Sequence, residues 1–280
     1  MTRRQLLAST ALAAGAAAAP QDVQRIERKG RLKQAVTRGV FGRGVPLEDM
    51  CRNAARLGVK GFDLIAPADF PILKKYGLVS SMASGAMTLT GGCNRKEDHP
   101  KVEKAMRELI DKAAEGGAPN VIALSGNRRG MSDQEGMDNV VAFLNSVKAQ
   151  AEEKGVTICL ELLNSKVNHP DYQCDRTSWG VELCKRVNSP RVKLLYDIYH
   201  MQIMEGDIIR TIRNNIQWIA HFHTAGNPGR HEMDDTQEMN YRGIARAIAD
   251  LNFQGYVAHE YSPARDALKS LEETLAMFDV

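Results

Sequence analysis

Eight short apolar runs alternate with longer segments of helical periodicity, and this alternation restricts the fold more than any other feature of the chain. A helix that connects one strand to the next gives parallel strand pairing, because a parallel connection needs a long crossover. The predicted strands lie near residues 34–37, 61–65, 78–82, 120–123, 156–161, 192–197, 218–223 and 255–260. The predicted helices span residues 46–57, 99–116, 132–155, 175–187, 207–213, 239–251 and 264–278.

Eight such units in about 250 residues predict one α/β domain over residues 34–280, folded as a closed (β/α)8 or TIM barrel. An open, doubly wound sheet is the alternative. The sequence disfavours it, because no Gly-x-Gly-x-x-Gly follows the first strand. For the same reason we expect no organic cofactor. The helix over 132–155 begins with a Ser-x-x-Glu capping pattern, Ser132 and Glu135.

The first twenty residues differ from the rest of the chain. Arg3 and Arg4 precede an uncharged, alanine-rich run that ends in small residues at Pro20. This pattern is typical of a twin-arginine export signal, and the apolar run is too short to span a membrane. We therefore expect a signal peptide over 1–20, a polar tether over 21–33, and export to the periplasm without stable membrane insertion.

Charge and cysteine content exclude several classes of protein. The formal net charge of +3 falls to +1 once residues 1–20, with two arginines and no acidic residue, are removed. A nearly neutral chain is not expected to bind nucleic acid. The five cysteines form no Cys-x-x-Cys pair, and Cys51 and Cys159 are expected to fill the core. An exported protein can form a disulfide, and the sequence does not decide whether any of the cysteines pair. A homo-oligomer is compatible with the sequence, which does not decide it.

Four strands in succession end on side chains that can bind a metal. Glu161, Asp197, His223 and Glu260 each follow an apolar run, about one strand–helix unit apart. In a barrel these positions lie together at the C-terminal mouth, where active sites occur. Three carboxylates and one imidazole predict a site for one divalent metal ion, Mn²⁺, Mg²⁺, Co²⁺ or Zn²⁺.

Other polar residues follow the same strands and are candidates for substrate binding. These are Asn164, His200, Arg230 and Glu232. An arginine on a glycine-containing loop suits capture of a carboxylate or phosphate. By strand alternation, His221 shares the inward face with His223 and is a candidate partner for it, whereas His259 points away from Glu260.

The first half of the chain carries weaker signals. Asp63 lies in the second predicted strand, His99 begins a helix, and Asn127 lies in the loop after the fourth strand. We expect a structural role for each of these three residues.

Four segments carry a resemblance to a known family. They are ELLN from Glu161 to Asn164, DIYHMQIMEGD from Asp197 to Asp207, HFHTAGNPGR from His221 to Arg230, and GYVAHE from Gly255 to Glu260. Together they resemble hydroxypyruvate isomerase and its relatives among the xylose-isomerase-like barrels. The resemblance covers about residues 34–278 and is densest over 156–263.

This resemblance implies roles for the strand-end residues. Glu161, Asp197, His223 and Glu260 would hold one divalent metal. Glu161 and Glu260 would act as acid and base, and His200 and Arg230 would touch the substrate. The implied reaction is a metal-dependent aldose–ketose type isomerisation through an enediolate, such as hydroxypyruvate to tartronate semialdehyde.

Two departures from the family pattern leave the substrate open. His223 stands where hydroxypyruvate isomerases carry Gln and ketose 3-epimerases carry His, and the expected export signal is unlike the cytoplasmic isomerases. The first alternative is therefore a ketose 3-epimerase or another keto-sugar or inosose isomerase. The second is a barrel that binds sugar without catalysis. An apurinic endonuclease of related fold would need several metals and is disfavoured by the charge.

Overall fold

The computed structural model describes residues 25–280, and the expected signal peptide lies outside the described residues. Eight strands form one parallel sheet. They are β1 Lys33–Val36, β2 Gly61–Phe62, β3 Val79–Ser80, β4 Asn120–Ala123, β5 Thr157–Leu162, β6 Val192–Asp197, β7 Ile219–Thr224 and β8 Tyr256–His259. All eight predicted strands are present, with ends that differ by up to three residues.

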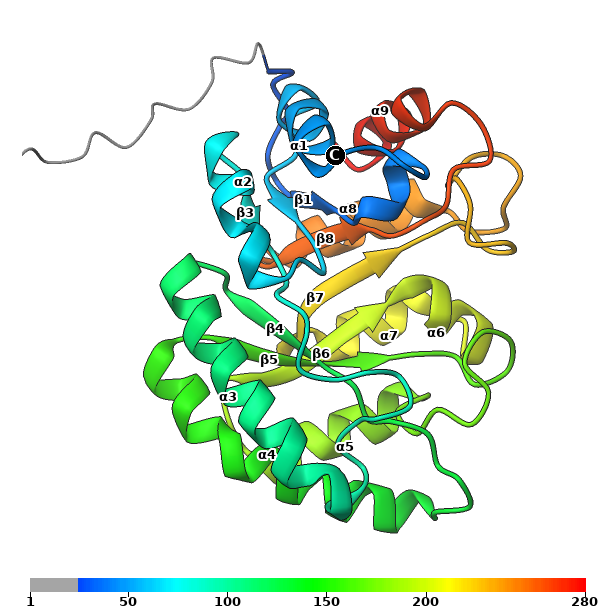
Figure 1. Cartoon of the computed structure of the whole chain (residues 1–280). Coiled ribbons are helices and arrows are strands. Elements are labelled where there is room, and N and C mark those ends of the chain that lie inside the picture. Colours follow the sequence, from blue (N-terminus) through cyan, green and yellow to red (C-terminus); the bar gives the residue numbers. More distant parts are fainter. Residues whose placement is uncertain (1–24) are drawn as a thin grey trace, which may run out of the picture.

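The helices lie outside the sheet (Figure 1). They are α1 Leu47–Arg56, α2 Phe70–Lys75, α3 His99–Gly116, α4 Asp133–Lys154, α5 Thr177–Val187, α6 Ile198–Met204, α7 Ile208–Asn215, α8 Tyr241–Asp250 and α9 Ala267–Met277. Ser132 caps α4 as its sequence predicts, since its side chain accepts a hydrogen bond from Glu135 N. The short helices α2 and α6 are too brief to show periodicity and were not predicted.

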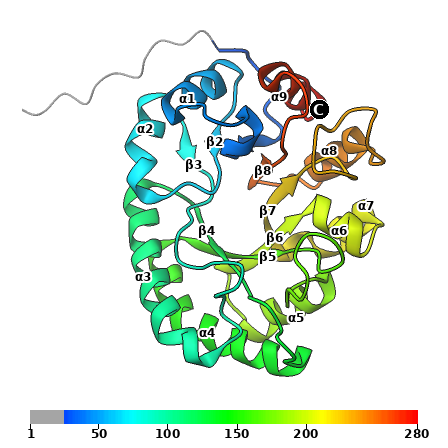
Figure 2. The same ribbon diagram turned by 45° about the vertical axis from the view of Figure 1, so that its right-hand side comes forward.

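The sheet curls into a barrel. The strand order is β3-β2-β1-β8-β7-β6-β5-β4, so β1 pairs with β8 although they lie at opposite ends of the sequence. The two outer strands meet through Ala83, whose N–H donates to Asn120 O at 2.9 Å and whose carbonyl accepts from Ile122 N at 3.0 Å. The view in Figure 2 shows the helices arranged around the strands. The predicted TIM-barrel fold is confirmed.

The strands of the second half are buried on both faces. Every residue of β5 is buried, and apart from one half-buried position each the same holds for β6 and β7. Parallel strands covered by helices require such near-continuous apolar sequence, which explains why these strands could be predicted within one residue. By contrast β2 ends at Phe62, earlier than expected, because Leu64 adopts a φ of 53° in the left-handed region.

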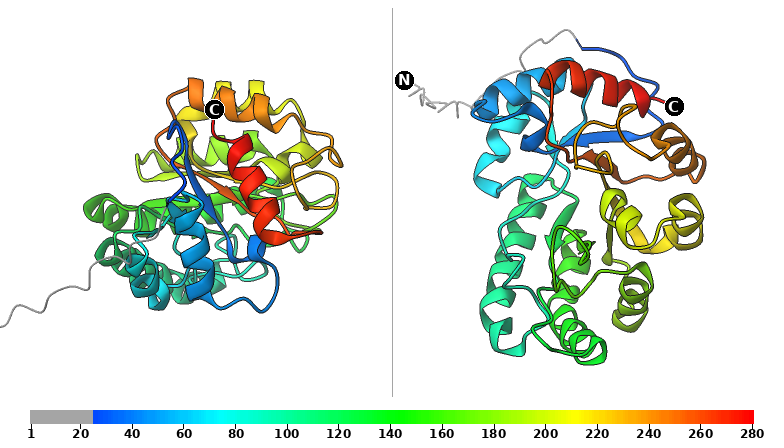
Figure 3. Two further views of the ribbon diagram at one scale, coloured as in Figure 1. Left: turned by 90° about the horizontal axis from the view of Figure 1, so that it is seen from above. Right: turned by 90° about the vertical axis from the view of Figure 1, so that its right-hand side faces the viewer.

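The segment expected to be a tether is attached to the barrel over its described part. Ile26 N donates to Arg56 O, Arg28 Nε donates to Leu57 O at 3.0 Å, and Lys29 N donates to Asp279 Oδ1 at 2.7 Å. These contacts hold it against α1 and the chain end after α9, and the right-hand view of Figure 3 shows α1 (blue) and α9 (red) at the same end of the molecule. None of the helices within residues 25–280 has both the length and the apolar character that crossing a membrane requires.

Candidate metal and active site

Glu161, Asp197, His223 and Glu260 meet at the C-terminal mouth of the barrel. One ligand atom of each lies within 4.8 Å of the others. Glu161 is in β5, Asp197 ends β6, His223 is in β7 and Glu260 directly follows β8. The parallel register explains the meeting, since it pairs Asp197 with His223 and places neighbouring strand ends at one level. The structure therefore brings together all four predicted metal ligands.

The imidazole of His223 is the centre of this cluster. Its Nδ1 lies 2.9 Å from Glu260 Oε2, 3.2 Å from Glu161 Oε1 and 3.9 Å from Asp197 Oδ2. It is buried and has no hydrogen-bond partner of good geometry among the described residues. Its other nitrogen, Nε2, is 2.7 Å from Asp63 Oδ2.

Asp197 serves two purposes with its two oxygens. Oδ1 accepts a hydrogen bond from His200 N at 3.1 Å and so caps the first turn of α6. Oδ2 is left to face His223, and Arg230 Nη2 lies 3.8 Å from it. The spacing of Asp197 and His200 in the sequence is therefore that of a helix cap, and the same turn brings the His200 ring to the cluster.

The site concentrates negative charge where water is excluded. Burial raises the pKa of Glu161 and also that of Asp197. Burial would also raise the pKa of Glu260, but His223 and Arg230 outweigh it and lower this pKa to about 2. Although burial opposes it, the surrounding carboxylates hold the pKa of His223 well above its ordinary value. Positive charge inside the cluster is thus strongly favoured.

A divalent ion fits this donor set. Three carboxylates and a histidine nitrogen without a partner face one point, which is a common ligand set for such ions. The Nε2 of His223 contacts a carboxylate, an arrangement that usually orients a metal-bound histidine. The net negative charge of the cluster would be reduced by the ion.

Arg230 reaches the cluster from the loop after β7. Its Nη2 lies 2.8 Å from Glu260 Oε2, and its guanidinium stacks over the Tyr199 ring at 5.6 Å. Its backbone adopts a φ of 58°, which costs a non-glycine residue about 1 kcal/mol or more. Hydrogen bonds from Arg230 N to Gly226 O and from Ser262 N to Arg230 O hold this conformation.

His200 offers a hydrogen-bond donor to the site. Asn164 Oδ1 accepts from Val167 N and Asn168 N, so its amide nitrogen faces His200 Nδ1 at 2.6 Å. Because that nitrogen donates, Nδ1 accepts and the proton lies on Nε2. This Nε2 is buried without a hydrogen-bond partner among residues 25–280, 3.6 Å from Asp197 Oδ2. Burial holds the pKa of His200 well below its ordinary value, which keeps the ring neutral.

Glu232 is placed differently from the other predicted site residues. Its carboxylate accepts hydrogen bonds from Ala264 N at 2.9 Å, Arg265 N at 3.2 Å and Ser270 Oγ at 2.8 Å. These contacts anchor the loop after β8 and give Glu232 a structural role there. This structural role replaces the substrate-binding role predicted for Glu232 from the sequence.

Two residues of the site, Asp63 and His169, carried little or no sequence signal. Asp63 contacts His223 and also lies 3.1 Å from His221 Nε2, and all three side chains are buried. His169 lines the cavity at the mouth, where its ring lies 5.1 Å from that of His200. By contrast His99 contacts Cys93 O, and the carbonyl of Asn127 accepts from Asn94, so both have local structural contacts.

A cavity of about 290 Å³ opens beside the cluster. Glu161, Glu260, Arg230 and His169 form its polar side. Besides Ser84 and Gly85, the rest of the lining forms an apolar wall of Leu64, Met87, Leu89, Ile122, Leu124 and Leu163. Polar groups converging at one end of a largely apolar cavity are typical of sites for small molecules.

A comparison with protein families matches residues 51–279 to the xylose isomerase-like TIM barrel family. This chain belongs to that family. The 2-oxo-tetronate isomerase of Cupriavidus necator is 34% identical over 127 residues, which are 45% of this chain and 46% of that protein. The hydroxypyruvate isomerase of Escherichia coli is 35% identical over 105 residues, 36% of this chain and 40% of that protein. The chain thus spans about half the length, or less, of these curated relatives.

Solved structures support the fold. The AP endonuclease, family 2, from Brucella melitensis has a TM-score of 0.77 at 24% identity, covering 88% of this chain and 98% of that one. The 3-keto-D-glucoside 4-epimerase of Escherichia coli has a TM-score of 0.75 at 20% identity, with the same coverage. At these identities the likeness extends to the barrel and its topology.

Proposed function

We propose that the chain is a metal-dependent isomerase of small hydroxy-carbonyl compounds, of the hydroxypyruvate isomerase type. The observation that carries this proposal is the placement of Glu161 and Glu260. Both line one cavity, and both lie beside the same free nitrogen of His223, 3.2 and 2.9 Å away. Two carboxylates in this position can remove and return a proton on neighbouring carbon atoms.

A bound divalent ion would polarise the substrate carbonyl and stabilise negative charge on its oxygen. One glutamate takes the proton from the carbon next to the carbonyl, and the other, or the same one, returns a proton to the former carbonyl carbon. His200 Nε2 donates a hydrogen bond to a substrate oxygen. The cavity-facing donors of Arg230 bind a terminal carboxylate. For hydroxypyruvate, a proton leaves C3 and one is added to C2, while the proton of the C3 hydroxyl passes to the C2 oxygen, which gives tartronate semialdehyde.

The apolar wall favours a second candidate, a ketose 3-epimerase or other keto-sugar isomerase. Hydroxypyruvate has three carbon atoms and would leave most of a cavity of about 290 Å³ unfilled. A longer keto-sugar could place its C–H groups against this wall. The same glutamates would then exchange the proton at one carbon and return it on the opposite face.

Proton exchange followed by NMR tests both candidates. The Mn²⁺-loaded protein is incubated in D₂O with hydroxypyruvate and, separately, with ketohexoses. Deuterium next to the carbonyl, absent with Mn²⁺ alone and abolished by EDTA, is the expected result, and the exchanging compound identifies the substrate class. If no compound exchanges although metal is bound, the isomerase proposal is wrong, and a barrel that only binds sugar becomes the better interpretation.

We also propose export to the periplasm by the twin-arginine route, supported by the sequence of residues 1–20. Replacement of Arg3 and Arg4 by lysine is expected to keep the full-length protein in the cytoplasm. Cell fractionation with immunoblotting measures this, and an unchanged distribution would contradict the proposal.

A further inference from the structure

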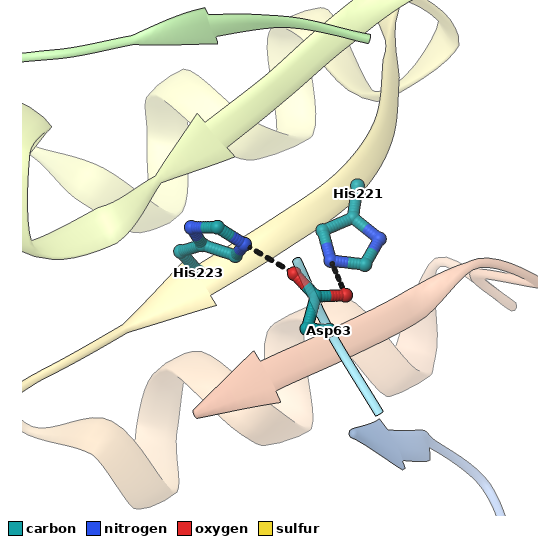
Figure 4. Close-up of side chains that lie close together, drawn as sticks. All are labelled: Asp63, His221 and His223. Atoms are coloured by element: carbon teal, nitrogen blue, oxygen red, sulfur yellow. Dashed lines mark hydrogen bonds and ion pairs between the residues drawn. The ribbon is translucent and has the colours of Figure 1, made fainter. Parts of the chain in front are cut away.

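Asp63 is a buried carboxylate that lies behind the proposed metal ligands and contacts one of them. It follows β2, in the half of the barrel that supplies none of the four ligands. Figure 4 shows its two oxygens directed at two histidines of β7. Oδ2 lies 2.7 Å from His223 Nε2, and Oδ1 lies 3.1 Å from His221 Nε2. None of these side chains is accessible to solvent.

The contact with His223 determines which nitrogen of that ring is free. An ionised carboxylate can only accept a hydrogen bond, so His223 Nε2 must carry the proton that lies between them. In the neutral ring, Nδ1 then has a lone pair and no proton. This is the nitrogen that faces Glu161, Asp197 and Glu260. The contact therefore selects the tautomer that can bind a metal at the cluster.

Asp63 is itself held from several directions. Ser81 Oγ, in the residue after β3, donates to Oδ1 at 2.5 Å. The backbone N–H of Asp63 donates to Val36 O at 2.8 Å. His221 lies on the remaining side, with its ring 5.3 Å from that of His223 and nearly perpendicular to it. These contacts hold the carboxylate in an orientation that directs Oδ2 at His223 Nε2.

The same three residues could be regarded as a second metal site, but their spacing favours hydrogen bonding. Each oxygen of Asp63 faces the nitrogen of a different histidine, so the carboxylate contacts the two rings separately. The separation of 2.7 Å between Asp63 Oδ2 and His223 Nε2 is typical of a charge-assisted hydrogen bond.

We propose that Asp63 is a positioning residue that orients His223 and fixes its tautomer so that Nδ1 is presented to a divalent ion. Ser81 and His221 hold Asp63 in the orientation that this requires. The inference rests on the metal site of the proposed function, and it does not depend on which substrate is converted. Partners of this kind behind a metal-bound histidine typically change metal affinity about 10- to 100-fold.

Metal affinity measured without any substrate tests the inference. Mn²⁺ is titrated calorimetrically into metal-free wild type, Asp63→Asn and Asp63→Ala. We expect the Kd to rise about 10- to 100-fold for Asp63→Ala. The rise should be smaller for Asp63→Asn, because its amide oxygen can still accept from His223. The absorption spectrum of bound Co²⁺ should also change in Asp63→Ala, since the orientation of a ligand is altered.

Asp175→Asn is the matched control. Asp175 is also buried, but its oxygens accept from Arg128 Nη2 at 3.0 Å and Ser165 Oγ at 2.6 Å, outside the cluster. The Asp175→Asn variant should bind Mn²⁺ with the same Kd as wild type. If Asp63→Ala does not fold, Ser81→Ala provides the milder test, because it removes one support of Asp63 and should weaken Mn²⁺ binding by a smaller factor.

The outcomes separate the two proposals. If wild type binds Mn²⁺ and the Asp63 variants bind it equally well with an unchanged Co²⁺ spectrum, the positioning role is wrong and the proposed function is unaffected. If wild type binds no divalent ion, the metal part of the proposed function fails first. A lack of turnover with every substrate, combined with weakened Mn²⁺ binding in the variants, would reject the isomerase proposal and support the role of Asp63.

Discussion

Glu161 and Glu260 reach the same histidine nitrogen from strands that are not neighbours in the sheet. Two strands, β6 and β7, lie between β5 and β8. The two carboxylates therefore approach His223 from different sides, and a substrate held at the cluster would lie within reach of both. In the proposed function this pair would serve in both metal binding and proton transfer, so its members should be sensitive to a change of one atom.

Replacement of either glutamate by glutamine should remove a negative metal ligand and a proton carrier together. We expect Glu161→Gln and Glu260→Gln each to lower the rate of deuterium exchange into substrate by about 10²-fold or more. Glu205→Gln is a suitable control, since Glu205 binds Thr177 outside the cavity. A glutamine variant with nearly wild-type exchange would exclude that glutamate from catalysis.

At the scale of the element, the ends of helices decide where functional side chains stand. The first turn of α6 is capped by a proposed metal ligand, Asp197, whereas α4 is capped by Ser132, far from the site in sequence and role. The α4 cap can therefore be removed without altering the cluster. Removing this cap isolates the contribution of a single hydrogen bond to the stability of the barrel, the one from Glu135 N to Ser132 Oγ at 3.1 Å.

Ser132→Ala should lower the free energy of unfolding by about 1 kcal/mol, because one N–H at the start of α4 loses its acceptor. Urea denaturation measures this as a lower midpoint with an unchanged m-value. Asn145→Ala, at an exposed position inside the same helix, should be neutral or slightly stabilising, since alanine is the better helix former. Equal effects of the two variants would show that the cap contributes nothing.

At the scale of the whole molecule, the core encloses every cysteine. All five are buried and unpaired in the structure. Burial raises the pKa of Cys51, Cys93 and Cys184 to about 12, and it raises the pKa of Cys159 and Cys174 as well. The native protein therefore has almost no thiolate at neutral pH.

This burial predicts both slow thiol reactivity and a loss of stability in alkaline solution. At pH 8 a disulfide reagent such as DTNB should react with the native protein very slowly, and with all five thiols in guanidinium chloride. Rapid reaction of the native protein would contradict the buried placement.

Above about pH 9 the unfolded chain loses thiol protons that the native protein retains up to about pH 12, so the free energy of unfolding should fall as pH rises through this range.

The buried negative charge of the cluster affects the stability of the whole barrel. A ligand that binds only the native state stabilises it by about 2.7 kcal/mol at a concentration of 100 times Kd. We therefore expect excess Mn²⁺ to raise Tm by at least about 5 °C. EDTA should reverse the change, and calorimetry or circular dichroism can follow it. An identical Tm with Mn²⁺ and with EDTA would contradict the metal site.

The repeated order of strand and helix determined the fold and the four proposed metal ligands from the sequence alone. Parallel strands place their ends at one edge, so a polar residue that ends each apolar run must join the others there. The sequence also indicated Arg230, His200 and Asn164, because they directly follow those strands.

Only the tertiary structure decided the roles of Asp63, His169, Glu232 and the apolar wall of the cavity. Asp63 meets His223 across 160 positions of sequence. It directly follows a strand of only two residues, which has too little periodicity to show which way its neighbours point. Glu232 and His169 lie in loops, where no repeat fixes direction and local hydrogen bonds decide it. The sequence thus predicts the position of a side chain where regular strand geometry determines that position. The positions of the other side chains are determined by long-range packing.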